Sequence, residues 1–187
     1  MSTTRTIMWD DQSCHWQGLS RSTETPRYEA LARIINSPEY FGANVLDIGA
    51  GEGLLARYLS RDKKYTGIEP SAAACAGAAN VTMIHSRIED MEAPLPSEVV
   101  VFNESLYYCS DPLSVLIKAK KLFLKNKGLL IVSIYQKPST WRDLFSSKMT
   151  NARATAILRK YLQRVRWRYT EQKIGVWLIF SAQNAAS

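Results

Sequence analysis

A glycine-rich turn between an apolar run and a helix is the feature that most constrains the fold of this chain. The run Val45–Ile48 contains an acid and leads directly into Gly49, Gly51 and Gly53. Glycine allows positive φ angles and lets backbone amides approach a ligand closely. Glu69 follows Gly49 by twenty positions, where a second parallel strand would end and a carboxylate can bind a ribose diol. The pattern predicts a nucleoside-bearing cofactor at the carboxyl edge of a doubly wound sheet.

The spacing of these glycines separates two classes of nucleotide-binding protein. Dehydrogenases use G-x-G-x-x-G, whereas here the third glycine comes one residue early and Leu54 takes its place. Asp47, which precedes the first glycine, would repel a pyrophosphate and attract a sulfonium amino acid. The resulting D-x-G-x-G-x-G pattern resembles that of the class I (Rossmann-like) S-adenosylmethionine-dependent methyltransferases. A dinucleotide enzyme and an ordinary strand–turn–helix without a ligand remain the alternatives.

Composition is that of an ordinary globular protein. The 187 residues, 46% hydrophobic and 22% charged, suit one domain. No run is long and apolar enough to span a bilayer, and Met1–Asp11 lacks the apolar segment of a signal peptide. The three widely spaced cysteines, Cys14, Cys75 and Cys109, argue against a disulfide framework and predict a cytoplasmic protein. With two histidines and scattered acids, we expect no metal site.

Charge is distributed unevenly along the chain. Residues 1–110 hold 9 of the 24 basic and 14 of the 17 acidic side chains, which leaves 15 basic and 3 acidic side chains for residues 111–187. This asymmetry indicates either a solvated surface or an anionic partner, such as nucleic acid, a small anion, an acidic carrier protein or membrane headgroups.

Helical and strand patterns alternate along the chain, which predicts an α/β protein with a mainly parallel sheet. Thr25 is expected to cap a helix that continues to Ile35, with Pro26 at its first position. Further helices are expected at 53–60, 111–124 and 152–161. Strands are expected at 45–48, 65–69, 81–84, 99–102 and 129–134, followed by a hairpin of 165–169 and 176–180. In that hairpin Arg164, Arg166 and Arg168 would share one face of an edge strand, where charges prevent aggregation and could also bind an anion.

The resemblance to class I methyltransferases covers nearly the whole chain and implies its topology. It implies a doubly wound, seven-stranded, mostly parallel sheet of order 3-2-1-4-5-7-6, with strand 7 antiparallel and helices on both faces. Residues 1–187 would form a single domain. Within it, 1–40 would serve as an N-terminal helical lid and 136–162 as a helical connection on the substrate side.

The resemblance also implies the residues that bind S-adenosyl-L-methionine. Asp47, Gly49 and Gly51 would surround the methionine part, and Glu69 would bind the ribose hydroxyls. Arg87 stands where the family has an acid for the adenine amino group, so Ile88 or Glu89 is expected to hold adenine instead. The full predicted set is Asp47, Gly49, Ala50, Gly51, Glu69, Pro70, Ile88 and Asn103, with Arg27 or Tyr28 reaching the carboxylate.

The loop after the fourth strand is expected to face both the donor and the acceptor. Glu104 and Tyr107 are the candidates for orienting or deprotonating the acceptor, although Glu104 would equally suit a cap or a salt bridge. Substrate contacts are expected from Trp16, Trp141 and Arg142, unless the tryptophans are core residues.

Three functions follow from these patterns. The first is methyl transfer from S-adenosylmethionine to a small-molecule acceptor, one with a negative group being an option. The second is an RNA or DNA methyltransferase, favoured by the basic C-terminal half. However, the segment Asn103-Glu104-Ser105-Leu106 does not match the Asn/Asp-Pro-Pro-Tyr/Phe loop of enzymes that methylate the exocyclic amines of bases. The third is a cofactor-binding protein of the same fold without catalysis.

Overall fold

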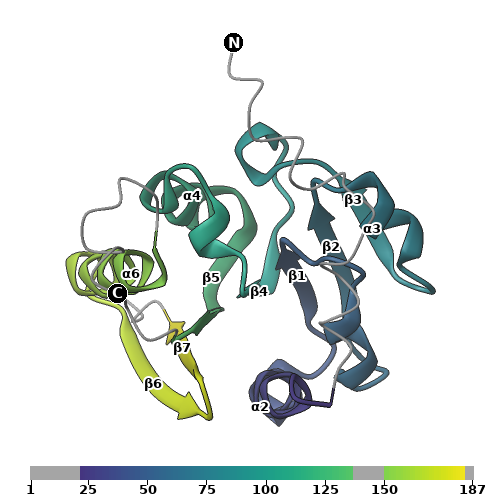
Figure 1. Cartoon of the computed structure of the whole chain (residues 1–187), viewed down its shortest axis with the longest axis horizontal. Helices are drawn as coiled ribbons and strands as arrows, with labels where there is room; N and C mark the ends of the chain where they lie inside the picture. The colour runs from purple at the N-terminus through teal and green to yellow at the C-terminus, as the bar shows by residue number, and fades with distance from the viewer. Residues whose placement is uncertain (1–21, 137–149, 184–187) are drawn as a thin grey trace.

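A single seven-stranded sheet organises the computed structural model, which describes residues 22–136 and 150–183. The strand order is β3-β2-β1-β4-β5-β7-β6, and β7 runs antiparallel to both β5 and β6 whereas the other neighbours are parallel (Figure 1). This confirms the predicted fold class. The strands are β1 (Asn44–Ile48), β2 (Lys64–Glu69), β3 (Thr82–His85), β4 (Ser97–Asn103), β5 (Leu124–Tyr135), β6 (Arg168–Ile174) and β7 (Trp177–Gln183).

Helices cover both faces of this sheet. One face packs against α2 (Thr25–Ile35) and the 3₁₀-helix η3 (Leu54–Tyr58). The other packs against α4 (Pro112–Lys118), the π-helical turn η6 (Ala119–Phe123) and α6 (Asn151–Arg164) (Figure 1). Residues of β1, β4, β5 and β7 enter both cores, so these strands are buried on both sides, whereas β6 is largely exposed.

The strand β1 illustrates how alternation separates the two cores. Val45 packs with α2 and η3, whereas Leu46 and Ile48 pack with α4 and α6. Burying a side chain of this size stabilises the fold by about 1.5–3 kcal/mol. The continuous apolar runs in β4 and β5 therefore anchor the middle of the sheet.

The first two predicted helices differ in detail from the structure. The cap of α2 is Glu24 rather than Thr25, and its side chain makes no capping hydrogen bond. The helix expected at 53–60 is the short 3₁₀-helix η3 instead. Gly53 has a φ of 70° and Leu59 is extended, and neither conformation fits an α-helix.

The strand β5 is longer than expected. It begins at Leu124, five residues before the expected start, so Gly128 lies within the strand. The register with β4 shifts where Ser97 pairs with Leu124 and Val99 with Leu129. An irregularity of this kind absorbs extra residues on one strand and leaves no periodic signal in the sequence.

The predicted hairpin begins later than expected. Arg164 is the last residue of α6, Arg166 lies in the following turn with a φ of 55°, and Arg168 begins β6. The prediction that these arginines share a strand face was therefore wrong. Val165 and Trp167 nevertheless contact the core beside α6, which explains why the segment alternates like a strand.

Shorter elements complete the connections: η2 (Pro38–Tyr40), α3 (Ala72–Gly77), η4 (Ile88–Asp90) and η5 (Leu106–Tyr108). Trp16, Trp141 and Arg142, predicted to contact the substrate, lie outside the described residues. None of the helices within 22–136 and 150–183 has the length and apolar character needed to cross a membrane.

Candidate active site

The glycine turn lies at the carboxyl edge of the sheet, directly after β1. Gly49, Gly51 and Gly53 have φ angles of 74°, 57° and 70°, a region that residues with a Cβ rarely adopt. The backbone amides of Gly49 and Ala50 both donate to the carbonyl of Ile68 in β2, at 2.8 and 3.1 Å. A Cβ on Gly49 would lie 2.4 Å from that of Ser105. The sequence requires glycine here because the turn is both left-handed and tightly packed.

Glu69, the last residue of β2, is bound directly to this turn. Its Oε2 accepts a hydrogen bond from the Gly51 amide and its Oε1 accepts one from the Ser71 amide, both at 2.9 Å. The residue is 2% exposed, and burial raises the pKa of its carboxyl above the ordinary value against the effect of the two amides. Each carboxylate oxygen has a second lone pair. Glu69 can therefore accept two hydroxyl groups while it holds the turn.

Asp47 lies in β1, the strand next to the one that ends at Glu69. Its Oδ2 accepts a hydrogen bond from the Tyr65 hydroxyl at 2.8 Å, whereas its buried Oδ1 has no hydrogen-bond partner among the described residues. Burial raises the pKa of Asp47 to about 7, with Tyr65 and Arg27 acting in the opposite direction. A cation beside Oδ1 would favour the ionised form. This orphaned oxygen fits the positively charged amino-acid part of S-adenosylmethionine.

A buried arginine connects α2 to the end of β4. Arg27 is 1% exposed, and its guanidinium donates to Oδ1 of Asn103 and to Oε2 of Glu24, both at 2.8 Å. The guanidinium carbon lies 4.8 Å from the ring centre of Tyr28 and 5.6 Å from that of Trp177. Within residues 22–136 and 150–183, its Nε has no hydrogen-bond partner.

This arginine fixes the orientation of the Asn103 amide. Arg27 has only donors, so the amide oxygen of Asn103 must face it, and that oxygen also accepts from the Ser133 hydroxyl at 3.1 Å. The amide nitrogen consequently points the other way and is left to donate. The side-chain amide of Asn103 can therefore donate to a ligand, whereas its oxygen is already occupied by Arg27 and Ser133.

Glu104 follows Asn103 with a φ of 62°. Its Oε2 accepts hydrogen bonds from the Tyr107 hydroxyl at 2.7 Å and the Tyr135 amide at 3.0 Å. Its Oε1 is buried and has no hydrogen-bond partner in the part of the chain that the structure describes, and burial raises the pKa of the carboxyl while Arg27 opposes this. Burial and the Glu104 charge raise the pKa of Tyr107 far above its ordinary value. Tyr107 is therefore a donor that orients Glu104, and Glu104 retains an oxygen that can take a proton.

Three further predicted residues have different surroundings. Tyr28 is 4% exposed and stacks on Tyr58 with ring centres 5.1 Å apart, so it packs between α2 and η3. Ile88 is 5% exposed and belongs to the core that contains α4. Pro70 lies beside His85, whose Nε2 is 3.0 Å from the Pro70 carbonyl oxygen.

The structure thus brings Asp47, Gly49, Ala50, Gly51, Glu69, Asn103, Glu104 and Arg27 to one edge of the sheet. Sequence analysis missed Ser133, which pairs with Asn103 in the β4–β5 register. A signal existed, because Ser133 is a polar residue in the apolar run 129–134. It also missed Tyr65, the donor to Asp47, which reads as an ordinary strand residue.

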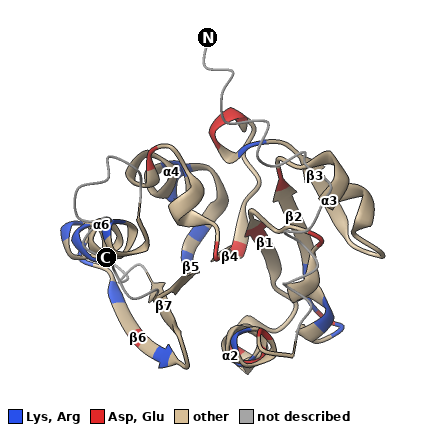
Figure 2. Ribbon diagram, viewed as in Figure 1, with Lys and Arg blue, Asp and Glu red and all other residues tan. Residues whose placement is uncertain are grey.

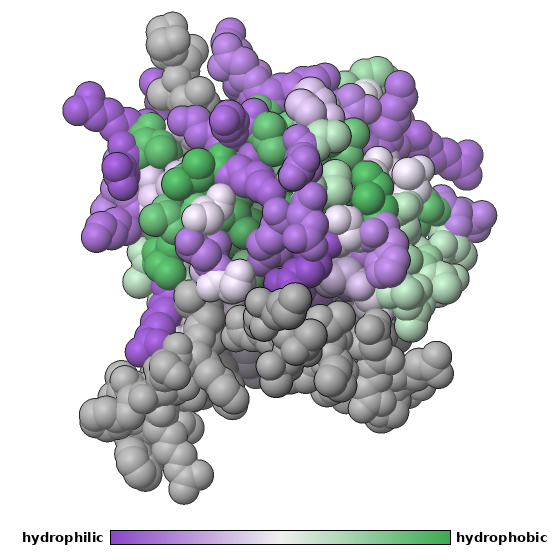
Figure 3. Space-filling model, turned by 90° about the horizontal axis from the view of Figure 1, so that it is seen from above, coloured by the Kyte–Doolittle hydropathy of each residue, from purple (hydrophilic) through white to green (hydrophobic). Residues whose placement is uncertain are grey.

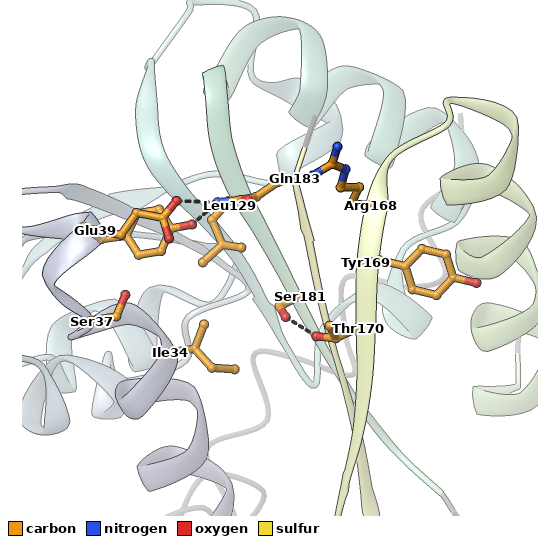
Figure 4. Close-up of a pocket in the computed structure, with 10 residues that line it drawn as sticks. Ile34, Ser37, Glu39, Leu129, Arg168, Tyr169, Thr170, Ser181 and Gln183 are labelled. Carbon is orange, nitrogen blue, oxygen red and sulfur yellow. Dashed lines mark hydrogen bonds between the residues drawn. The ribbon is translucent and has the colours of Figure 1, made fainter. Parts of the chain in front are cut away.

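Two cavities among the described residues lie at the amino ends of the parallel strands, at the end opposite to the candidate active site. One of about 350 Å³ is lined by residues that include Leu129, Arg168 and Gln183, and Gln183 hydrogen-bonds Glu39 at 3.0 Å within it (Figure 4). The other, of about 560 Å³, lies between η3 and the starts of β2 and β3. Neither contains a residue predicted to bind the cofactor. No group of three or more possible metal ligands occurs within the described ranges.

Comparison with known proteins agrees with this geometry. A family model described as a methyltransferase domain matches residues 24–183. No curated protein matches the sequence. Three solved structures similar to the chain illustrate the shared fold.

The first is an S-adenosylmethionine-dependent methyltransferase from Aquifex aeolicus, with a TM-score of 0.70 and 15% identity over 91% of this chain and 97% of that one. The second is the N-methyltransferase NodS from Bradyrhizobium japonicum with bound S-adenosylhomocysteine (0.68, 17%, 97% of each chain). The third is the 1,6-didemethyltoxoflavin-N1-methyltransferase from Burkholderia thailandensis with its substrate and S-adenosylhomocysteine (0.68, 15%, 97% of this chain and 88% of that one). The chain therefore belongs to the methyltransferase-domain family and is a methyltransferase that uses S-adenosylmethionine as its methyl donor.

Proposed function

We propose that this enzyme transfers a methyl group from S-adenosylmethionine to a small-molecule acceptor at the carboxyl edge of the sheet, in the cytoplasm. The observation that carries the proposal is the bond between the Glu69 carboxylate and the Gly51 amide. It joins the acid at the end of β2 to the glycine turn after β1, so that both can contact one nucleoside. Residues 1–187 would act as a single domain.

Each part of the cofactor has a complementary group at this edge. Glu69, next to Pro70, accepts the ribose hydroxyls, and the turn at Ile88 receives adenine. Asp47 lies beside the amino-acid part of the cofactor. The turn at Gly49, Ala50 and Gly51 lets this part come close to the backbone. The Nε of Arg27 and the amide nitrogen of Asn103 offer N–H groups to the carboxylate of the cofactor. The ring of Tyr28 lies against the Arg27 guanidinium and supports it.

When bound, the cofactor supplies a methyl group on a cationic sulfur, which is open to in-line displacement. The task of the protein is to position the acceptor and to exclude water. Glu104 takes the proton of the acceptor at Oε1, because its Oε2 is held by Tyr107 and Tyr135. Its raised pKa makes the carboxylate a better base near neutral pH.

A small-molecule acceptor is supported by the donor character of Asn103. A base-amine enzyme would use a side-chain oxygen to accept a hydrogen from the target amine, and here that oxygen faces Arg27. The donor amide instead suits an acceptor with a carbonyl or a negative group. We include Trp16, Trp141 and Arg142 as acceptor contacts, from the lid 1–40 and the connection 136–162. The toxoflavin enzyme of the same fold also acts on a small molecule.

Calorimetric titration with S-adenosylmethionine and S-adenosylhomocysteine tests cofactor binding. Both should bind to the wild type, and Glu69→Ala and Gly51→Val should abolish binding. Glu52→Ala is the matched control, because Glu52 is a half-buried acid of the same turn that none of the proposed contacts uses. A folded wild type that binds neither compound would overturn the proposal.

Transfer of a radiolabelled methyl group into a fractionated cell extract tests the acceptor class. The label should enter the small-molecule fraction, and Glu104→Gln should slow its transfer while binding of S-adenosylhomocysteine persists. Label confined to RNA would favour the nucleic-acid alternative. Cofactor binding without transfer to any fraction would favour a non-catalytic role.

A further inference from the structure

Lys118 makes an unusual set of contacts for a lysine at the end of a helix. It is the last residue of α4, and its Nζ donates to the carbonyl oxygens of Ile88, Glu89 and Met91. The bond to Met91 measures 2.9 Å and that to Ile88 3.4 Å. An ammonium group has three donors, so this one side chain can satisfy three carbonyl oxygens within a stretch of four residues.

Ile88 and Glu89 belong to η4, a single 3₁₀ turn between β3 and β4, and Met91 is the residue directly after this turn. A helix leaves its last carbonyl groups without internal partners, and a nearby cation satisfies them. The other polar contacts of the turn are weaker. Ser110 reaches Oε1 of Glu89 at 3.3 and 3.4 Å, and the ion pair of Arg87 with Glu89, at 3.6 Å, joins side chains that are 42% and 27% exposed. Among the described residues, Lys118 therefore makes the main polar contacts between η4 and the rest of the fold.

We infer that Lys118 is a positioning residue for the adenine of the cofactor. The inference rests on the proposed function, in which the turn at Ile88 receives adenine. Ile88 packs on the core beside Val115 and Leu116 of α4, so the apolar contact sets the depth of the turn and the ammonium fixes its backbone. This combination compensates for Arg87, which stands where a contact to the adenine amino group was expected. The backbone of η4, held by Lys118, defines the adenine edge of the site.

Binding of S-adenosylhomocysteine and of adenosine to the full chain tests this role. Lys118→Met keeps the length of the side chain and removes its donors. We expect both dissociation constants to rise by about tenfold, the equivalent of one lost hydrogen bond to a charged group. The two ligands should be affected equally, because adenosine contains the whole group that the turn contacts. Lys118→Arg, which keeps the charge and several donors, should recover most of the affinity.

Two control variants separate positioning from general stability. Lys121→Met removes an exposed lysine of η6, and Ile35→Val destabilises the other core, in which α2 packs and which does not include Ile88. Both should bind S-adenosylhomocysteine within about twofold of the wild type at a temperature where all variants are folded. If Lys118→Met does not fold, Lys118→Gln carries the same comparison.

The outcomes distinguish this inference from the proposed function. A wild type that binds neither ligand would defeat the proposed function itself. A wild type that binds both, with unchanged affinity in Lys118→Met, would show that Lys118 has no positioning role. The same conclusion would follow if Ile35→Val weakened binding as much as Lys118→Met does.

Discussion

At the scale of single residues, the charge of Asp47 depends strongly on its surroundings. Burial raises its pKa to about 7, whereas an aspartate in an unfolded chain titrates near 4. Between these values the folded protein binds a proton that the unfolded chain has lost. The contribution of Asp47 to the free energy of unfolding therefore falls as the pH rises from about 4 to about 7, and then stays level.

Asp47→Asn removes this titration and keeps an oxygen for the Tyr65 hydroxyl. Between pH 4 and pH 8 the wild type should lose up to about 4 kcal/mol of stability relative to the variant. Urea denaturation of both proteins at the two pH values measures the change, since the other carboxyl groups cancel in the difference. An equal difference at both pH values would show that Asp47 does not titrate in this range.

Gly49 tests how tightly the turn is packed. Gly49→Ala places a Cβ 2.4 Å from that of Ser105 at a φ of 74°, so both strain and overlap should destabilise the fold. Gly42→Ala is the matched control, because Gly42 has a φ of 68° with open space around it. We expect the control to lower the free energy of unfolding by about 1–2 kcal/mol. Gly49→Ala should lower it by about 1–3 kcal/mol more. Equal losses in urea denaturation would contradict the packing of this turn.

At the scale of elements, local patterns predicted the parts of the site that a single segment defines. The apolar run of β1, its glycine turn and the acid at the end of β2 lie in continuous stretches, so sequence placed Asp47, Gly49 and Glu69 together. Ser133 and Arg27 approach Asn103 only through the strand register and the packing of α2. Contacts between distant segments leave no periodic trace in one sequence.

The junction of α6 and β6 shows a different reason for error. Apolar residues alternate at Val165, Trp167 and Tyr169, which resembles a strand. In the structure a helix end and a left-handed turn at Arg166 produce that alternation. The packing of Tyr161 and Trp167 in the core determines where the helix ends and the strand begins. A short window of sequence does not contain the residues of that core.

The start of α4 provides a prediction for an element. Asp111 caps this helix, because its Oδ1 accepts from the amides of Leu113 and Ser114. Its Oδ2 accepts from the Ser114 hydroxyl, and these bonds lower the pKa of the carboxyl below the ordinary value. Asp111→Ala should reduce the free energy of unfolding at pH 7 by about 1 kcal/mol.

The pH dependence of this effect should be opposite to that of Asp47. A lowered folded pKa gives stability that is present above the ordinary pKa of an aspartate and is lost as the pH falls through the folded value. The cost of Asp111→Ala should therefore shrink in acid. Asp90→Ala is the control, since the exposed Asp90 side chain has no hydrogen bond to the described residues. A cost that is independent of pH would argue against the cap.

At the scale of the whole molecule, charge is separated across the sheet. Acidic residues mark the carboxyl ends of β1, β2 and β4, whereas basic residues gather over α6, β5 and β6 (Figure 2). Exposed lysines and arginines of η6, the end of α6 and the start of β6 lie at the amino ends of the parallel strands: Lys120, Lys121, Lys160, Arg164 and Arg168. On the face seen in Figure 3, hydrophobic residues occur in groups between hydrophilic side chains. The basic region therefore lies away from the candidate active site.

This separation predicts how a nucleic acid would behave. A short RNA should bind, if at all, through the basic region with strong dependence on salt. It should leave the dissociation constant of S-adenosylhomocysteine unchanged within about twofold, because the two regions lie at opposite ends of the strands. Competition between RNA and S-adenosylhomocysteine in a fluorescence titration would contradict this arrangement and favour a nucleic-acid substrate.

The most direct test of the central claim is a crystal structure of the enzyme with S-adenosylhomocysteine. We predict that the ribose hydroxyls lie within hydrogen-bonding distance of the Glu69 carboxylate and that the amino-acid part lies beside Asp47 and the glycine turn. A nucleoside bound in either cavity at the amino ends of the strands, or a carboxyl edge filled by the protein's own side chains, would contradict the account.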